Sequence, residues 1–293
     1  MINKINTSPF RYHPEDQFKI LRNNSYSFRL NAGDKRILDA VHRSVAVTPL
    51  LLLGQLTALG DTVSDQNLRM NLERLFTKGF LNKTVLKDPD SITPPQTIYS
   101  LSKAYLRSLA EYPEKLDLLL CKRLLAAQQY LCTAGIYRSG ATITMNTLIT
   151  EKDVKPGFYS DHQFRCDALI QGQNDQTAFV LAVRKTRNWM QDLKDQLATM
   201  ERTIFSPRAL TVQTKDSNVV LIFEDDAHQA EAEQALLQDE TCRYEFPVSV
   251  TNDIQTFGCS LFHQTKLIPD LKKGLAQQVS GRLVTCIETA FKL

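Results

Sequence analysis

The chain has 293 residues, which is long enough for two domains with separate hydrophobic cores, and its composition excludes wholesale disorder. No apolar run approaches the ~20 residues that cross a bilayer. Residues 1–17 also lack the apolar core of a signal peptide, so we expect a cytoplasmic protein with no membrane partner. The net charge of +3 is divided unevenly: residues 1–110 carry 15 Lys and Arg against 9 Asp and Glu, whereas residues 111–293 carry 20 against 23. The basic excess predicts nucleic acid as the partner of the first part.

Residues 1–110 contain a predicted arm followed by five short elements. We expect residues 1–33 to form the arm, with short extended pieces around Tyr26–Leu30. Helical and strand periodicity then predicts, in chain order, helices at Lys35–Val45, Pro49–Leu59 and Ser64–Gly79 and strands at Leu81–Leu86 and Thr97–Leu101. Three helices followed by a hairpin are typical of a winged helix DNA-binding domain, which we place at residues 34–110.

The third predicted helix has one apolar face and one polar face. Leu68, Leu72 and Leu75 recur at helical spacing and are expected to face the core. Ser64 is a good N-cap, and Gly79 can adopt the left-handed conformation that ends a helix. An apolar back, a polar front with arginines and a basic hairpin directly after it indicate a DNA-reading helix and its wing.

The polar face supplies the predicted DNA contacts. The N-terminal half of a reading helix enters the major groove first, so we expect Gln66, Asn67 and Met70 to lie nearest the base edges. Basic residues are expected to hold phosphates. They are Arg69, Arg74, Lys78, Lys83 and Lys87. We expect Glu73 to pair with Arg69 or Arg74, or to accept a hydrogen bond from a cytosine amino group.

The second part of the chain predicts alternating helices and strands. After helices at 103–110 and 114–131, the expected elements are strands Ala141–Ile149, Phe164–Ile170 and Ala178–Lys185, helix Trp189–Ile204, strand Asn218–Phe223, helix Asp226–Leu237, strand Tyr244–Val250 and a final helix Gln277–Phe291. A helix between two buried strands must cross over, which predicts a parallel pair inside a mixed sheet. The fold class is therefore α/β, or α+β for the whole chain.

The αβββαβ order resembles the restriction-endonuclease-like nuclease core, which we place at residues 111–293. That fold holds Mg²⁺ with an acid on one strand and an acid-x-lysine triplet on the next. Here Asp167 matches the first acid and Lys185 matches the lysine, but Ala182 or Val183 stands where the second acid belongs. One carboxylate is too few to hold a divalent ion, so we expect both residues to be vestigial, with no catalysis and no cofactor. A structural Asp167, capping a turn or pairing with Arg165 or Lys185, is favoured over a metal ligand.

A winged helix in front of such a domain resembles the replication-relaxation family of plasmids and integrative or conjugative elements. The matching stretches are Asn67–Leu81, Cys166–Ile170 and Phe179–Lys185. The resemblance implies a DNA-binding accessory or regulatory protein that serves plasmid replication, mobilisation in conjugation or transcriptional control. On this hypothesis we expect double-stranded DNA as partner, a relaxase or replication protein as a second partner, and a homodimer.

Two alternatives remain open on the sequence. The first is a metal-dependent nuclease with a rearranged site, in which Asp167 and Lys185 combine with an acid from elsewhere, such as Glu151 or Asp161, and Mg²⁺. The second is a protein-interaction scaffold whose winged helix recruits a relaxase or a replication initiator. Cleavage of DNA would identify the first alternative, and negligible DNA affinity would identify the second.

Overall fold

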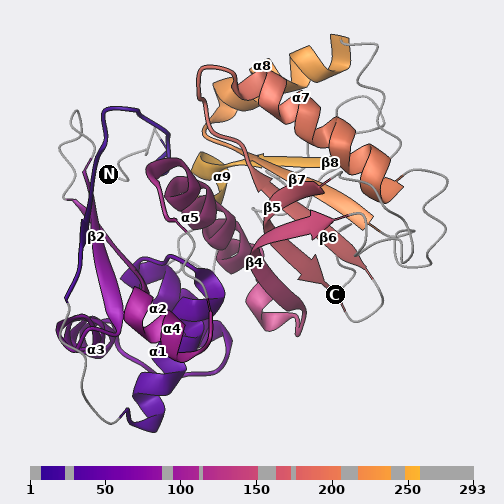
Figure 1. Cartoon of the computed structure of the whole chain (residues 1–293). Helices are drawn as coiled ribbons and strands as arrows, with labels where there is room; N and C mark the ends of the chain where they lie inside the picture. The colour runs from indigo at the N-terminus through magenta and orange to yellow at the C-terminus, as the bar shows by residue number, and fades with distance from the viewer. Residues whose placement is uncertain are drawn as a thin grey trace, which may run out of the picture. The chain divides into compact units, whose positions relative to one another are not determined.

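The computed structural model describes residues 8–23, 30–87, 95–111, 115–150, 163–172, 176–205, 217–238 and 248–257. It is a mixed α/β protein with one three-stranded and one five-stranded sheet (Figure 1). The chain forms two compact units, one of residues Tyr12–Gln128 and one of Met1–Arg11 with Gln129–Leu293. The division falls inside one helix, α5 (Leu118–Thr133), whereas we predicted a boundary between residues 110 and 111.

The unit of residues Tyr12–Gln128 contains the three predicted helices. They are α1 (Ala32–Ser44), α2 (Pro49–Ala58) and α3 (Asp65–Thr77), and a short α4 (Lys103–Ser108) follows later. Each begins at a side-chain oxygen that accepts from a backbone N–H of its first turn, as N-caps do. These caps are Asn31, Thr48, Ser64 and Ser102. Gly79, at a φ of 80°, ends α3 as predicted.

Three antiparallel strands complete this unit. They are β1 (Gln17–Leu21), β2 (Leu81–Lys87) and β3 (Gln96–Leu101), with β2 in the centre. The predicted hairpin is confirmed, but the predicted arm is wrong in one respect, because β1 is a strand of the sheet. Of the extended pieces expected around Tyr26–Leu30, residues 24–29 lie outside the described residues.

The core of this unit lies behind α3. Leu68, Leu72 and Leu75 are fully buried, as their spacing predicts. They share the interior with apolar residues of the other helices and the sheet, namely Leu38, Val41, Leu52, Leu56 and Ile98. Burying a leucine side chain stabilises a fold by about 1.5–3 kcal/mol, so the apolar back of α3 orients the helix and leaves its other face to solvent.

The other unit is built on the five-stranded sheet. Its strands lie in sequence order, β4 (Thr142–Thr150), β5 (Gln163–Gln171), β6 (Thr177–Ala182), β7 (Ser217–Phe223) and β8 (Val248–Asn252). The β4–β5 and β5–β6 pairs are antiparallel, whereas the β6–β7 and β7–β8 pairs are parallel. The predicted mixed sheet with a crossover is therefore confirmed, with three parallel strands rather than two.

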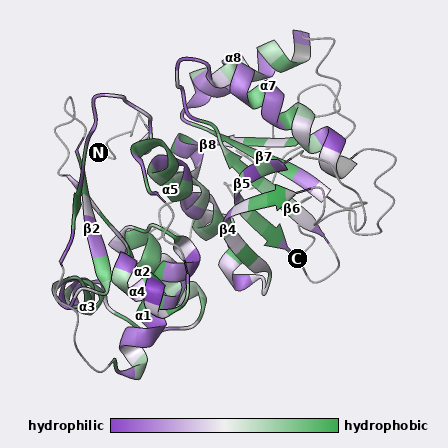
Figure 2. Cartoon of the chain, in the orientation of Figure 1, coloured by the Kyte–Doolittle hydropathy of each residue, from purple (hydrophilic) through white to green (hydrophobic). Residues whose placement is uncertain are grey.

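Two helices make the parallel connections, α7 (Trp189–Met200) and α8 (Asp226–Gln238). Both pack into one apolar cluster with the same face of β6, β7 and β8, which Figure 1 shows beneath them. After polar first residues, strands β6 and β7 are hydrophobic, and the helices carry both kinds of residue (Figure 2). Shorter elements are a 3₁₀ turn at Ile136–Arg138, a π turn at Glu201–Phe205 and α9 (Asp253–Phe257).

Two sequence predictions fall on other parts of the chain. The helix expected at Gln277–Phe291 and the first residues of the strand expected at Tyr244–Val250 lie outside the described residues. Among the helices that are described, none is both long enough and apolar enough to span a membrane.

Candidate nucleic-acid interface

The N-terminal half of α3 presents three uncharged side chains to solvent. Gln66 and Asn67 are exposed, and Met70 is 59% exposed, the largest fraction among the exposed large hydrophobic residues described. The buried leucines lie on the opposite side of the same helix. The three residues predicted to lie nearest base edges therefore share one accessible face. Two amides and a thioether on that face offer hydrogen bonds and an apolar contact, which are the chemistries that distinguish base pairs in the major groove.

Arg69 lies on the exposed side of α3 and pairs within its own helix. Its Nε lies 2.8 and 2.9 Å from the two carboxylate oxygens of Asp65, one turn earlier. Both side chains are about half exposed. An exposed pair of this kind contributes little free energy, so Arg69 can exchange Asp65 for a phosphate at small cost.

Arg74, a predicted phosphate ligand, has two partners within the protein. Its guanidinium donates to the carboxylate of Asp34, which is 2% exposed, and to Asn71 Oδ1 at 3.1 Å. Asp34 belongs to the first turn of α1, where its Oδ2 also accepts from the Asn31 backbone N–H at 3.3 Å. Arg74 thus joins α3 to the capping box of α1.

Glu73 and Lys83 join α3 to the sheet. Lys83 Nζ lies 2.5 Å from Glu73 Oε1, and the Tyr99 hydroxyl donates to the same oxygen. Partial burial raises the pKa of Glu73, but the hydrogen bonds from Lys83 and Tyr99 outweigh it and the pKa is lowered. Burial, and then the bond to Glu73, raises the pKa of Tyr99. The sequence-based expectation that Glu73 pairs with Arg69 or Arg74 is wrong.

Two predicted phosphate ligands remain to be placed, Lys78 and Lys87. Lys78 is half-buried at the end of α3, and Lys87 is exposed at the end of β2. Sequence analysis missed Lys19, which is exposed on β1 beside β2. No local signal identified it, because its strand pairs with residues more than sixty positions along the chain.

Asp167 and Lys185, the vestigial nuclease candidates, have separate partners. Asp167 is fully buried on β5, and its Oδ2 accepts from the Ala182 backbone N–H at 2.7 Å, beyond the point where the β5–β6 pairing ends. Lys185 Nζ lies 2.6 Å from Glu231 Oε2 on α8. Asp167 therefore completes the sheet, and Lys185 ties the end of β6 to a helix.

The described residues do not fit a divalent metal. No group of three His, Cys, Asp or Glu side chains among them is placed to hold an ion. Asp167 already serves as a backbone acceptor, and Ala182 and Val183 supply no second carboxylate. Glu151 and Asp161, the acids of the nuclease alternative, lie outside the described residues.

A buried polar cluster lies where β6, β7 and β8 end, and sequence analysis did not identify it. Arg184 Nη2 lies 3.1 Å from Asp253 Oδ1, and both side chains are fully buried. The Ser8 hydroxyl donates to the other oxygen of Asp253. Burial raises the pKa of Asp253 to about 6, although Arg184 and Ser8 oppose the shift. These groups hold the N-terminal segment of this unit against its sheet.

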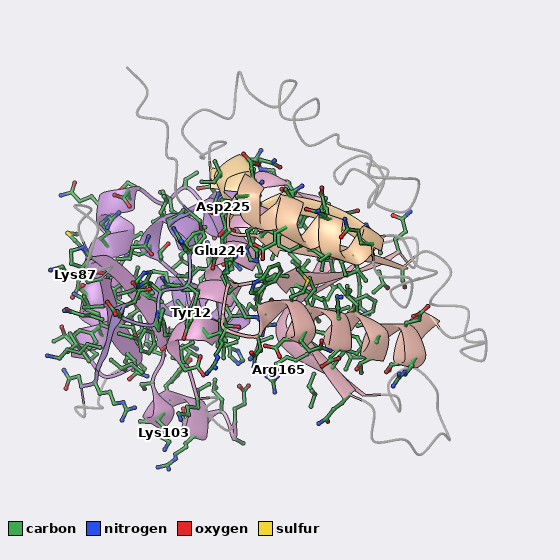
Figure 3. All side chains as sticks on the ribbon, turned by 90° about the horizontal axis from the view of Figure 1, so that it is seen from above. Tyr12, Lys87, Lys103, Arg165, Glu224 and Asp225 are labelled. Carbon is green, nitrogen blue, oxygen red and sulfur yellow. The ribbon has the colours of Figure 1, made fainter. Side chains whose placement is uncertain are left out.

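His228, on α8, borders the same cluster. Its Nδ1 accepts from the Glu224 backbone N–H at 3.3 Å, and its ring packs edge-on to Trp189 with centroids 4.3 Å apart. Burial, and then the charges of Arg184 and Lys185, lower the pKa of His228 to about 4. Figure 3 labels Glu224 and its neighbour Asp225 where β7 leads into α8. The ring therefore joins the start of α8 to the end of β7 and to Trp189.

No family model, no curated protein and no solved structure matches the chain.

Proposed function

We propose that the protein is a non-catalytic DNA-binding protein with a winged helix domain at residues 34–110, in which α3 reads the duplex and the β2–β3 hairpin is the wing. The order α1-α2-α3-β2-β3 supports this proposal. A backbone bridge between Val47, which lies between α1 and α2, and Tyr99 on β3 ties the helices to the hairpin in a single unit.

The exposed face of α3 carries the proposal. Gln66, Asn67 and Met70 are accessible together on the half of the helix that would enter a major groove first. Lys83 and Lys87 follow on β2, directly after the helix. Uncharged groups on the helix and cations beside it match the division between base contacts, which specify sequence, and phosphate contacts, which position the protein.

In this proposal, residues 111–293 form a restriction-endonuclease-like domain that is catalytically inactive. The order α5-β4-β5-β6-α7-β7 supports the likeness, and the missing second carboxylate argues against the chemistry. The biological setting rests on the resemblance to the replication-relaxation family. It would be an accessory or regulatory role in a plasmid or conjugative element, in the cytoplasm, with a relaxase or replication protein as partner and a homodimer as the active form.

Duplex binding measured against salt tests the proposal. We expect the purified chain to bind a fluorescently labelled duplex of mixed sequence, with an affinity that falls steeply as salt rises. Selection from a randomised duplex pool should yield a preferred sequence, and a variant with Gln66→Ala and Asn67→Ala should lose that preference while it keeps affinity for mixed sequence. No binding at low salt would contradict the proposal and favour the scaffold alternative.

A further inference from the structure

Strand β1 pairs with β2 on the side away from β3, and so widens the surface of the β2–β3 hairpin. Its register places Gln17 opposite Lys87, Lys19 opposite Val85 and Leu21 opposite Lys83. Residues directly opposite each other in an antiparallel pair point to the same face, and side chains alternate between faces along each strand. Lys19, Lys83 and Lys87 therefore share one face of the sheet.

That face is open toward the end of β2. On the opposite face Thr84 and Leu86 are buried. On the lysine face Lys83 and Val85 are half-buried, whereas Lys87 is exposed, and Lys19 is exposed on β1. The accessible part of this face thus carries the exposed Lys19 and Lys87, and the half-buried Lys83 lies next to it.

The lysine face is continuous with α3. Lys83 meets the helix at Glu73 and lies 5.9 Å over the ring of Phe76. The segment after β1 also reaches α3, because the Asn23 side-chain amide donates to the Thr77 carbonyl at the end of the helix, at 2.7 Å. A ligand lying along the exposed face of α3 would therefore meet this face of the sheet.

No acidic side chain in the described part of the sheet pairs with the lysines of this face. Lys19 is the diagonal neighbour of both Lys83 and Lys87, a relationship that places side chains ~7–8 Å apart. Within the described residues, Lys19 and Lys87 form no ion pair, and Lys83 pairs with Glu73 of the helix. Because Glu73 offsets the charge of Lys83, the uncompensated like charges beside Val85 are those of Lys19 and Lys87 among the described residues, and a row of anionic groups relieves their repulsion.

We propose that β1 is a DNA-contacting strand, and that Lys19 with Lys83 and Lys87 forms a phosphate-binding surface on the face of the sheet. This inference rests on the proposed function and deepens it, because it assigns the backbone of duplex DNA to the sheet face and the base edges to α3. Contacts to phosphates carry no sequence information, so this surface adds affinity for every duplex and leaves the preference for a particular sequence unchanged.

Charge-removing variants test the inference. Lys19→Gln, Lys87→Gln and the double variant are compared with the unchanged chain by fluorescence anisotropy on a labelled duplex of mixed sequence. Each phosphate contact contributes about 0.9 to the slope of log affinity against log salt. We expect each single variant to reduce that slope by about 0.9, and to reduce the loss of affinity between 50 and 200 mM salt by about 3.5-fold. The double variant should reduce that loss by roughly tenfold.

Lys103→Gln is the matched control. Lys103 is an exposed lysine at the start of α4 in the same unit, and Figure 3 shows it well apart from Lys87. We expect this variant to keep the original slope. Lys19→Arg, which keeps the charge, should also keep it. Far-UV circular dichroism and thermal melting confirm that each variant is folded, as expected for substitutions of exposed side chains.

Each outcome decides a specific point. A chain that fails to bind duplex DNA at low salt overturns the proposed function and this inference together. A chain that binds, with a slope unchanged by Lys19→Gln or reduced equally by Lys103→Gln, overturns the inference alone. A reduced slope with Lys19→Gln, an unchanged slope with Lys103→Gln and an unchanged preferred sequence support it.

Discussion

Arg74 on α3 donates to the carboxylate of Asp34 on α1, across forty positions of the chain. The same carboxylate closes the capping box of α1 with Asn31. The buried carboxylate of Asp34 thus caps the first turn of α1 and also binds the guanidinium of Arg74 on α3. The ion pair therefore adds a polar link between α3 and α1 to the packing of the leucines that orients α3.

Arg74→Ala should destabilise the protein. The substitution leaves Asp34 charged and buried, and breaking a buried pair costs about 3–5 kcal/mol. Because the Arg74 side chain is 38% exposed, solvent weakens the pair and we expect about 2–3 kcal/mol. Urea unfolding followed by circular dichroism measures the change. Arg69→Ala, which removes an exposed arginine of the same helix, should cost less than about 1 kcal/mol. Equal losses in the two variants would contradict this assignment.

Asp253 and His228 should give opposite dependences of stability on pH. Asp253 has a folded pKa of about 6, above the ordinary 3.8, so the folded state binds its proton more tightly and its contribution to stability falls as pH rises from 4 to 6. His228 has a folded pKa of about 4, below the ordinary 6.5, so its contribution rises as pH rises from 4 to 6.5. Each contribution is about 3 kcal/mol, so the two largely cancel in the unchanged chain.

Single variants separate the two contributions. With Asp253→Asn, the free energy of unfolding should rise between pH 4 and pH 6.5 more steeply than in the unchanged chain, because the opposing contribution of Asp253 is removed while that of His228 remains. With His228→Phe it should fall across pH 4 to 6 relative to the unchanged chain. Urea unfolding at several pH values measures both. A slope that neither variant alters would show that the two groups have ordinary pKa values in the folded protein.

Asp167→Ala should lower the free energy of unfolding, and the unchanged chain should not cleave DNA. The buried carboxylate accepts from the Ala182 N–H, and an unsatisfied buried amide costs about 1–3 kcal/mol. We expect that loss in urea unfolding. We also expect no cleavage of supercoiled plasmid by the unchanged chain with Mg²⁺ or Mn²⁺. Cleavage that Asp167→Ala abolishes and Lys185→Gln weakens would instead establish the nuclease alternative.

Local periodicity predicted much of this fold, and distant pairing explains what it missed. The spacing of Leu68, Leu72 and Leu75 predicted α3 and its buried face, because burial acts along a single helix. The partners of Arg74 and Lys19 depend on segments far away in the chain, at Asp34 and Val85. Sequence therefore predicted the exposed face of α3, but it gave no sign of the pairing between Arg74 and Asp34 or of strand β1.

Glu73 gives a further test of the proposed DNA-binding surface. Its carboxylate holds Lys83 and places a negative charge, 48% exposed, between α3 and the sheet. Glu73→Gln removes that charge and releases Lys83, so duplex affinity should rise for every sequence. The salt slope should also steepen by up to about 0.9, because Lys83, which shares its charge with Glu73 in the unchanged chain, would then contact phosphate alone. Glu111→Gln, which removes an exposed acid that pairs with His42, is the control and should change the slope less. If Glu73 instead accepts a hydrogen bond from a cytosine amino group, affinity should fall only for duplexes that carry that cytosine. A comparison of two duplexes that differ at one base pair of the selected sequence separates these outcomes.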